Sequence, residues 1–298
     1  MNLLTPSFPR FSPFLVATML TAGFLCLNPV TAVEVIDDDA MREYFQKGTE
    51  HLLKKGVFPD PKAFQKELAA ATNSAPEITL ANMATKSLSQ DRLVDKCDNS
   101  VVMVGSLYNC GHCPNWHISC AGAVAIGKNG IFVTNYHVLE DEKGLNEAIA
   151  IMTKDRRIFP VTRVLAASKA NDLAIFEAKG AKLRPLPLGT DPEIGETVHA
   201  IHHPRGRFFT YTQGVVSRHF IFNDNGTKVH RMAITADYAQ GSSGSPILDD
   251  KGNLVGLVAS TNTLDYKSTN EKRGYITQMV VKSCVPASSI MHAITVGE

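Results

Sequence analysis

The chain has 298 residues, and its 30 Lys and Arg against 29 Asp and Glu leave a formal net charge of +1. Hydrophobic residues make up 44% and charged residues 20%, the proportions of a folded protein with a sizeable core. The balanced charge argues against a non-specific nucleic-acid binder, which needs an excess of Lys and Arg. Composition excludes this class but names no function.

The first 32 residues have the pattern of a secretory signal peptide. Arg10 is the only charged residue ahead of an apolar stretch from Phe14 to Leu27, which is short for a membrane span. A proline ends this stretch, and Ala32 offers a small residue for cleavage. We therefore expect residues 1–32 to be removed and the mature chain to be secreted or periplasmic, with no membrane contact after cleavage. A retained N-terminal anchor is the alternative.

Export places the remaining cysteines in a compartment that permits disulfides. Four of the five that follow the signal peptide fall between positions 97 and 120, so local disulfides with one free thiol are the first interpretation. A second interpretation is a tetrahedral zinc site with three thiols and one imidazole, formed by Cys110, Cys113, His117 and Cys120. A third is thiol oxidoreductase chemistry at Cys110 and Cys113, although that chemistry needs the dithiol at a helix start and a strand-like run follows here.

Residues 33–95 have the residue pattern of helices, unlike most of the chain that follows. Strong helix formers with apolar residues at helical spacing predict helices over Asp38–Lys55 and Lys62–Ala71, separated by Gly56 and a Pro-Asp-Pro sequence. We expect a helical N-terminal extension that serves either as a pro-segment or as a packing arm. At the other end of the chain, Pro286 to Ile294 predicts a short closing amphipathic helix.

From about residue 96 onward the sequence is typical of an all-β protein. Short runs rich in Val, Ile and Thr are divided by Gly, Asn, Asp and Pro. They predict strands at Val101–Val104, Ala121–Ile126, Ile131–Val133, Leu173–Phe176, Thr197–Ile201, Gly214–Val216, Ala233–Thr235, Leu254–Val258 and Tyr275–Val281. A dozen or so short strands over about 190 residues indicate a barrel or a sandwich with two lobes.

Three motifs on this scaffold supply the groups that acyl transfer needs. His137 follows a strand within Thr-Asn-Tyr-His-Val-Leu, Asp172 opens a strand within Asn-Asp-Leu-Ala-Ile, and Ser243 lies within Gly-Ser-Ser-Gly-Ser-Pro. A serine hydroxyl is a poor nucleophile until a base takes its proton, imidazole titrates near neutrality, and a carboxylate fixes the imidazole tautomer. Glycines beside the serine let backbone N–H groups point at a developing oxyanion.

The order of these motifs and their flanking residues resemble the chymotrypsin-like (trypsin-fold) serine peptidases. The spacings, 35 residues from His137 to Asp172 and 71 from Asp172 to Ser243, resemble the compact bacterial branch with the high-temperature-requirement proteases and the glutamyl endopeptidases. The resemblance implies an all-β domain over residues 96–298, with two six-stranded antiparallel β-barrels after the helical extension. It also implies a triad of these three residues, an oxyanion hole from the N–H groups of Gly241 and Ser243, polypeptide substrates and no cofactor.

The sequence departs from the family pattern in the motif around Ser243. Ser245 replaces the second glycine of the family's Gly-x-Ser-Gly-Gly-Pro, and Ser242 stands where animal zymogens carry the aspartate that binds a newly freed N-terminus. Activation by insertion of the N-terminus is therefore not expected. His202 and His203, which precede a proline, are interpreted as loop residues rather than metal ligands.

The resemblance further implies which residues bind the substrate. Asp237, the sixth residue before Ser243, would lie at the floor of the primary specificity pocket and favour Arg or Lys on the acyl side of the scissile bond. The substrate backbone would pair with the edge strand Ala259, Ser260 and Thr261. The alternative is that this loop lacks the family's pocket disulfide, takes another path and turns Asp237 to solvent.

Two other functions compete with a serine endopeptidase. One is a catalytically inactive trypsin-fold module that only binds, and the intact triad argues against it. The other is the thiol oxidoreductase based on Cys110 and Cys113.

Overall fold

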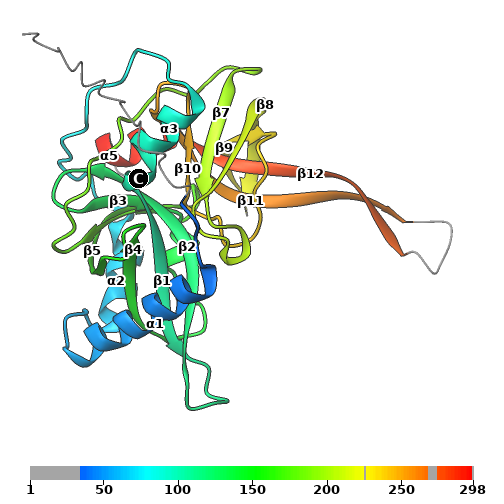
Figure 1. The fold of residues 1–298 in the computed structure, drawn as a ribbon. Helices are drawn as coiled ribbons and strands as arrows, with labels where there is room; N and C mark the ends of the chain where they lie inside the picture. The colour runs from blue at the N-terminus through cyan, green and yellow to red at the C-terminus, as the bar shows by residue number, and fades with distance from the viewer. Residues whose placement is uncertain (1–33, 225, 268–273, 297–298) are drawn as a thin grey trace, which may run out of the picture. The chain divides into compact units, whose positions relative to one another are not determined.

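The computed structural model describes residues 34–224, 226–267 and 274–296 (Figure 1). The expected signal peptide, residues 1–32, lies outside these residues. In the part of the chain that the structure describes, no helix is both long enough and apolar enough to cross a membrane.

The first barrel is a closed antiparallel sheet of six strands in the order β1-β2-β3-β6-β5-β4. The strands are β1 (Val101–Asn109), β2 (Trp116–Gly127), β3 (Ile131–Thr134), β4 (Asn146–Thr153), β5 (Ile158–Ser168) and β6 (Leu173–Ala178). Its interior is apolar, and the fully buried rings of Phe132 and Phe176 stack with their centroids 5.6 Å apart. Inward-facing side chains fill a barrel of this size, so it has a packed core rather than a channel.

The second barrel repeats this plan in the order β10-β11-β12-β9-β8-β7. The strands are β7 (Thr197–His202), β8 (Thr210–Asp224), β9 (Thr227–Ile234), β10 (Pro246–Leu248), β11 (Leu254–Lys267) and β12 (Tyr275–Pro286). Strands β11 and β12 continue past the barrel as a two-stranded hairpin, paired as far as Lys267 and Tyr275 (Figure 1). The prediction of two six-stranded antiparallel barrels is confirmed.

Two strands of the first barrel carry weak sequence signals and were not predicted. Strand β4 alternates Ala148 and Ala150 with larger residues, and β5 contains Pro160. Alanine and proline are both depleted in strands, so local composition hides segments that the closing of the barrel makes extended.

The predicted terminal helices are present within one or two residues of their expected bounds. Helix α1 (Asp38–Lys54) and helix α2 (Pro61–Ala70) form the extension, and α5 (Ala287–Thr295) closes the chain. Each of the first two begins at an aspartate: Asp37 accepts the N–H of Ala40 at 3.0 Å, and Asp60 caps α2 in the same way. A third helix, α3 (Gln90–Cys97), was not predicted, and short 3₁₀ turns lie at Ala71–Asn73, Asp98–Ser100 and Pro204–Gly206.

The extension packs on the barrels as an arm and belongs to the same structural unit, which begins at Ile36. Helix α1 lies along the first barrel, where Phe45 is fully buried against Met103 and Ile118. Farther along, Ala84 exchanges two hydrogen bonds with the buried side chain of Asn253 in the second barrel, at 2.7 and 2.9 Å. The extension therefore contacts both barrels.

Candidate active site

His137 lies on a single helical turn that follows a buried strand. Strand β3 carries core residues of the first barrel, and α4 (Tyr136–Leu139) comes directly after it. The side-chain amide of Asn135 donates to the backbone carbonyl of Asp172 at 2.9 Å. This bond fixes the start of the turn, which presents the imidazole at the surface with 47% of the side chain exposed.

Asp172 comes immediately before β6, the strand that pairs with β3. The register places Thr134 opposite Ala174, so Asp172 lies beside the residues that follow β3. Its backbone is left-handed, with φ of +53°, a conformation that Asp tolerates better than most residues. The carboxylate accepts the backbone N–H of His137 at 3.1 Å and its Nδ1–H at 2.9 Å. Two neighbouring strands thus unite residues 35 positions apart.

This carboxylate sets the protonation of His137. Both oxygens of Asp172 lie 2.9 Å from Nδ1, so Nδ1 carries the hydrogen and Nε2 is left as the acceptor. Burial of the imidazole opposes its protonation. The hydrogen bond and charge of Asp172, together with the charges of Glu140 and Glu142, outweigh burial and raise the pKa of His137 above its ordinary 6.5.

Ser243 lies in a loop that requires two glycines. Gly241 and Gly244 have φ of +92° and +74°, values that residues with a Cβ rarely adopt. At Gly244 the available space demands glycine as well, because a Cβ would lie 2.0 Å from Oγ1 of Thr134. The carbonyl of Ser243 accepts the N–H of Gly122 at 2.8 Å. The loop from the second barrel is therefore seated on β2 and on the end of β3, next to the turn that carries the histidine.

Two backbone N–H groups of this loop have no acceptor among the described residues. The N–H groups of Ser242 and Gly244 donate to backbone carbonyls at 3.0 and 2.9 Å, whereas those of Gly241 and Ser243, which alternate with them, donate to no described group. A pair of unoccupied donors on one turn is what an oxyanion hole needs. Within the described part of the chain the histidine–aspartate pair is hydrogen-bonded, and no hydrogen bond joins Ser243 to His137.

Behind Ser243, a buried imidazole holds the neighbouring residue of the loop. The fully buried Ser242 has its Oγ 2.9 Å from Nδ1 of His202, whose Nε2 lies 3.1 Å from Oγ1 of Thr212. Thr212 uses its only hydroxyl proton on the carbonyl of Asp237 at 2.8 Å. It must therefore accept from Nε2–H of His202, whose Nδ1 in turn accepts the Ser242 hydroxyl.

His202 is neutral in this network. Burial lowers its pKa to about 4, although the charge of Asp237 acts in the opposite direction. His202 is the last residue of β7 and not the loop residue that was expected. Both of its ring nitrogens form hydrogen bonds within the protein, so neither is available to a metal. Its contact with Ser242 has no sequence signal, because the two residues are 40 positions apart.

A cavity of about 250 Å³ opens beside the histidine–aspartate pair. Phe220, Phe222 and Arg231 from β8 and β9 form one wall, and Ala259 and Ser260 from β11 form another. Two of the three residues expected to bind the substrate backbone therefore line this cavity, and the third follows them on the same strand. Beyond its short contact with β10, this edge of β11 pairs with no strand among the described residues.

Asp237 does not have the environment that its expected role requires. Its side chain is 86% exposed, and its carboxylate pairs with Nζ of Lys282 at 2.8 Å. It is also absent from the residues that line the cavity. The buried residue at this point is its neighbour Tyr238, whose hydroxyl lies 3.0 Å from the carbonyl of Ser260 and 2.8 Å from that of Ser283. The structure thus has the alternative arrangement, with Asp237 turned to solvent.

The cysteines lie in four separate places. All five described cysteines are free thiols, so the structure contains none of the expected disulfides. Cys97 and Cys284 are buried in different clusters. Cys110 and Cys113 lie with His117 at the tip of the β1–β2 hairpin. Cys120 does not join them, because three residues along β2 place it on the opposite face of the strand, against the apolar residues of α1. The structure therefore does not form the four-ligand zinc site that the sequence suggested, because Cys120 is missing from it.

The hairpin also excludes the structural setting of a thiol oxidoreductase. Cys110 and Cys113 lie in a loop between antiparallel strands, not at the start of a helix. Hydrogen bonds from the backbone of His112 and from Cys113 lower the pKa of the partly buried Cys110 thiol to about 6.

Residues 120–257 match the family model of the trypsin-like peptidase domain. Protease Do-like 5, chloroplastic, from Arabidopsis thaliana is 35% identical over 149 residues, which cover 46% of this chain and 46% of the relative. A probable periplasmic serine endoprotease, DegP-like, from Hahella chejuensis is 30% identical over 141 residues, which cover 47% of this chain and 29% of the relative. The chain therefore spans less than half the length of these curated relatives.

Comparison of structures gives the same fold. The HtrA-type protease AlgW with decapeptide superposes with a TM-score of 0.55 at 20% identity, covering 70% of this chain and 67% of that chain. At this identity the likeness concerns the fold alone. Residues 120–257 thus match a trypsin-like peptidase domain, and the curated homologues at about 30% identity include HtrA- and DegP-like serine proteases.

Proposed function

We propose that the protein is an exported serine endopeptidase that hydrolyses peptide bonds through His137, Asp172 and Ser243. The observation that carries the proposal is one arrangement of groups. A histidine bonded to a carboxylate lies beside a serine loop, and two backbone N–H groups of that loop have no acceptor among the described residues.

In the proposed reaction, Oγ of Ser243 attacks the scissile carbonyl while Nε2 of His137 takes its proton. The negative charge that develops on the carbonyl oxygen is stabilised by the N–H groups of Gly241 and Ser243. The imidazolium formed on His137 is stabilised by Asp172 and returns the proton to the leaving amine. Water then attacks the acyl-enzyme by the same route. The hydrogen bond between Ser243 and His137 forms with substrate, as such bonds often tighten only in the complex.

The proposed substrates are polypeptides bound in extended form. The open edge of β11 offers backbone groups to a substrate strand. The cavity beside His137 offers two phenylalanine rings to apolar substrate side chains. A homologous fold has been solved with a decapeptide. Since Asp237 is exposed and already paired with Lys282, we do not propose it as the determinant of primary specificity.

Export is supported by the N-terminal sequence and by relatives described as periplasmic or chloroplastic. Mass spectrometry of the mature protein should then find its N-terminus at Val33.

The test of the function is the variant Ser243→Ala. We expect casein cleavage to fall by about 10⁴- to 10⁶-fold with the fold intact, because the nucleophile is removed and only the binding groups remain. A fluorophosphonate probe should label the parent at Ser243 and should not label the variant. Ser245→Ala is the matched control, because its buried hydroxyl has no hydrogen-bond partner in the described structure and should be dispensable for labelling. Equal cleavage by Ser243→Ala would show that Ser243 is not the nucleophile. A folded parent that neither cleaves casein nor reacts with the probe would favour the inactive binding module instead.

A further inference from the structure

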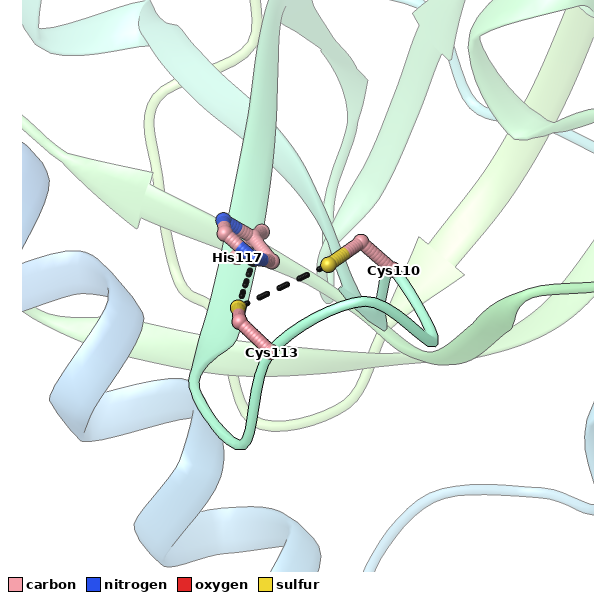
Figure 2. Close-up of side chains that lie close together, drawn as sticks. All are labelled: Cys110, Cys113 and His117. Atoms are coloured by element: carbon pink, nitrogen blue, oxygen red, sulfur yellow. Dashed lines mark hydrogen bonds between the residues drawn. The ribbon is translucent and has the colours of Figure 1, made fainter.

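The tip of the β1–β2 hairpin gathers two thiols and an imidazole outside the candidate active site. Cys110 and Cys113 come from the loop, and His117 is the second residue of β2 (Figure 2). The two sulfur atoms lie 3.5 Å apart, and Sγ of Cys113 lies 3.1 Å from Nε2 of His117. All three potential ligand atoms lie within 4.8 Å of one another. Three side chains of two types that metals favour, thiol and imidazole, therefore lie close together.

We propose that Cys110, Cys113 and His117 bind one zinc ion, with the fourth coordination position open to solvent. Two thiolates and one imidazole are ligands that favour zinc over hard cations such as magnesium or calcium. The inference concerns a site distinct from His137, Asp172 and Ser243 and does not rest on the proposed peptidase activity.

The distances match a tetrahedral ion more closely than a disulfide. With Zn–S of about 2.3 Å and Zn–N of about 2.0 Å, tetrahedral angles require about 3.8 Å between two sulfurs and about 3.5 Å between sulfur and nitrogen. The observed separations of 3.5 and 3.1 Å need only small side-chain rotations to reach these values. A disulfide would require the sulfurs to approach to about 2.05 Å.

The backbone around the cluster fixes the positions of the ligands. Tyr108 lies directly opposite His117 in the β1–β2 register, and the two rings stack with centroids 5.4 Å apart, which orients the imidazole. In the loop, Gly111 has φ of +72° and donates its N–H to the side chain of Asn109 at 2.9 Å. The turn therefore holds the two cysteines on the same side before any metal binds.

The number of protein ligands follows from the strand geometry. Cys120 points to the opposite face of β2 and packs against α1, so it cannot complete the shell. His112 is exposed on the same loop and is not part of the cluster. Three protein ligands and one solvent position make a site that a small exogenous ligand can reach, unlike a closed four-ligand structural site.

The experiment loads the full mature chain, reduced and then freed of reductant, with zinc alone and measures bound metal by mass spectrometry after dialysis. We expect about one ion per chain in the parent. Cys113→Ser and His117→Ala should each weaken binding more than about 100-fold, above the effect of changing residues that only support a ligand. The matched controls are His112→Ala, from the same loop, and Cys120→Ser, from the same strand, and both should bind zinc like the parent.

A second measurement does not depend on variants. Zinc should slow alkylation of Cys110 and Cys113 in the parent, mapped by peptide mass spectrometry, and should leave buried Cys97 and Cys284 unchanged. Cobalt in place of zinc should give thiolate-to-metal charge-transfer absorption. The proposal is overturned if the reduced parent binds no zinc, or if Cys113→Ser retains the full amount. Ser243→Ala should bind zinc normally, so a failure of the peptidase proposal and a failure of this one give different results.

Discussion

At the residue scale, the proposed activity depends on the protonation state of His137. The imidazole can accept the serine proton only when it is neutral. Asp172 raises its pKa above the ordinary 6.5, which makes it a stronger base but requires a higher pH to free it of its own proton. The raised pKa of His137 also makes the stability of the fold depend on pH, and here the lower pH is the favourable one. The ion pair stabilises the fold fully below the unfolded pKa, and this stabilisation is lost as pH rises through the folded pKa.

We therefore predict that kcat/KM rises with pH through an acid limb whose midpoint lies above 6.5. Asp172→Asn removes the negative charge and one acceptor, so the midpoint should move to lower pH and kcat should fall by about 10⁴-fold. The measurement is a pH–rate profile of a peptide substrate for both proteins. An acid limb that stays in place in the variant would show that Asp172 does not set the pKa of His137.

A second residue acts through the backbone next to the nucleophile. His202 holds the hydroxyl of the buried Ser242, so it is a positioning residue for the loop and not a catalytic one. We predict that His202→Ala lowers kcat by about 10²-fold with a small change in KM, because a displacement of about 1 Å at the nucleophile is that costly. His202→Gln, which keeps an acceptor, should recover part of the rate. If both variants lose stability equally and retain kcat, His202 has only a structural role.

At the element scale, the two barrels meet where the serine loop crosses β2 and β3. The carbonyl of Ser243 accepts from Gly122, and the hydroxyl of Thr134 donates to the carbonyl of the same Gly122 at 2.7 Å. The barrels can approach this closely only because Gly122 and Gly244 have no side chains. A Cβ on Gly122 would lie 2.0 Å from Oγ of Ser245. The end of β3, which leads into the turn that carries the histidine, and the loop that carries the serine are thereby held together.

Alanine substitutions should have different effects at two glycines with positive φ, because only Gly244 lies at this contact between the barrels. Gly244→Ala adds a methyl group 2.0 Å from a hydroxyl and 2.4 Å from a carbonyl, so we expect a loss of about 2–5 kcal/mol of unfolding free energy and of nearly all activity. Gly56→Ala meets nothing within 4 Å at a φ of +67° and should cost only the conformational term of about 1–2 kcal/mol. Chemical denaturation of both variants checks this, and equal losses would disprove the steric argument.

At the scale of the whole molecule, the extension is part of the fold. Phe45 and Leu68 are fully buried, α1 reaches the connection between β7 and β8 through a bond of 2.9 Å from the N–H of Phe208 to Asp38, and the segment after α2 bonds to Asn253. A pro-segment that is released on activation would expose these apolar surfaces to water. The packing-arm interpretation is therefore the one we retain as a proposal.

We predict that Phe45→Ala destabilises the protein by about 3–5 kcal/mol, the usual cost of emptying a buried aromatic site. The adjacent Tyr44→Ala is the control, because that residue is 48% exposed and the loss of its side chain should cost less than about 1 kcal/mol. Urea denaturation of the mature chain gives both values. A chain that begins near Leu93 should fail to fold, and a stable, active protein of that length would show that the extension is dispensable.

The sequence by itself determined the features that depend on local pattern. Strong helix formers and the helical spacing of apolar residues predicted α1 and α2, and short β-branched runs between turn residues predicted most strands of both barrels. The residue types and order of His137, Asp172 and Ser243 identified the candidate site, because acyl transfer needs those three groups and a glycine-containing loop. Strands β4 and β5 were not predicted, since their extended conformation comes from closing the barrel rather than from their own composition.

Only the tertiary structure decided which side chains meet when they are distant in sequence. It also decided on which face of a strand a given side chain lies. It turned Asp237 toward Lys282 and solvent. In this loop it is the neighbouring Tyr238 whose side chain is buried and hydrogen-bonded to Ser260. It placed Cys120 on the face of β2 opposite to His117, since side chains three positions apart on a strand point to opposite sides. It also joined His202, at the end of β7, to Ser242, in the loop before the neighbouring strand β10. The contact between His202 and Ser242 arises from packing between elements, so no local pattern in the sequence encodes it.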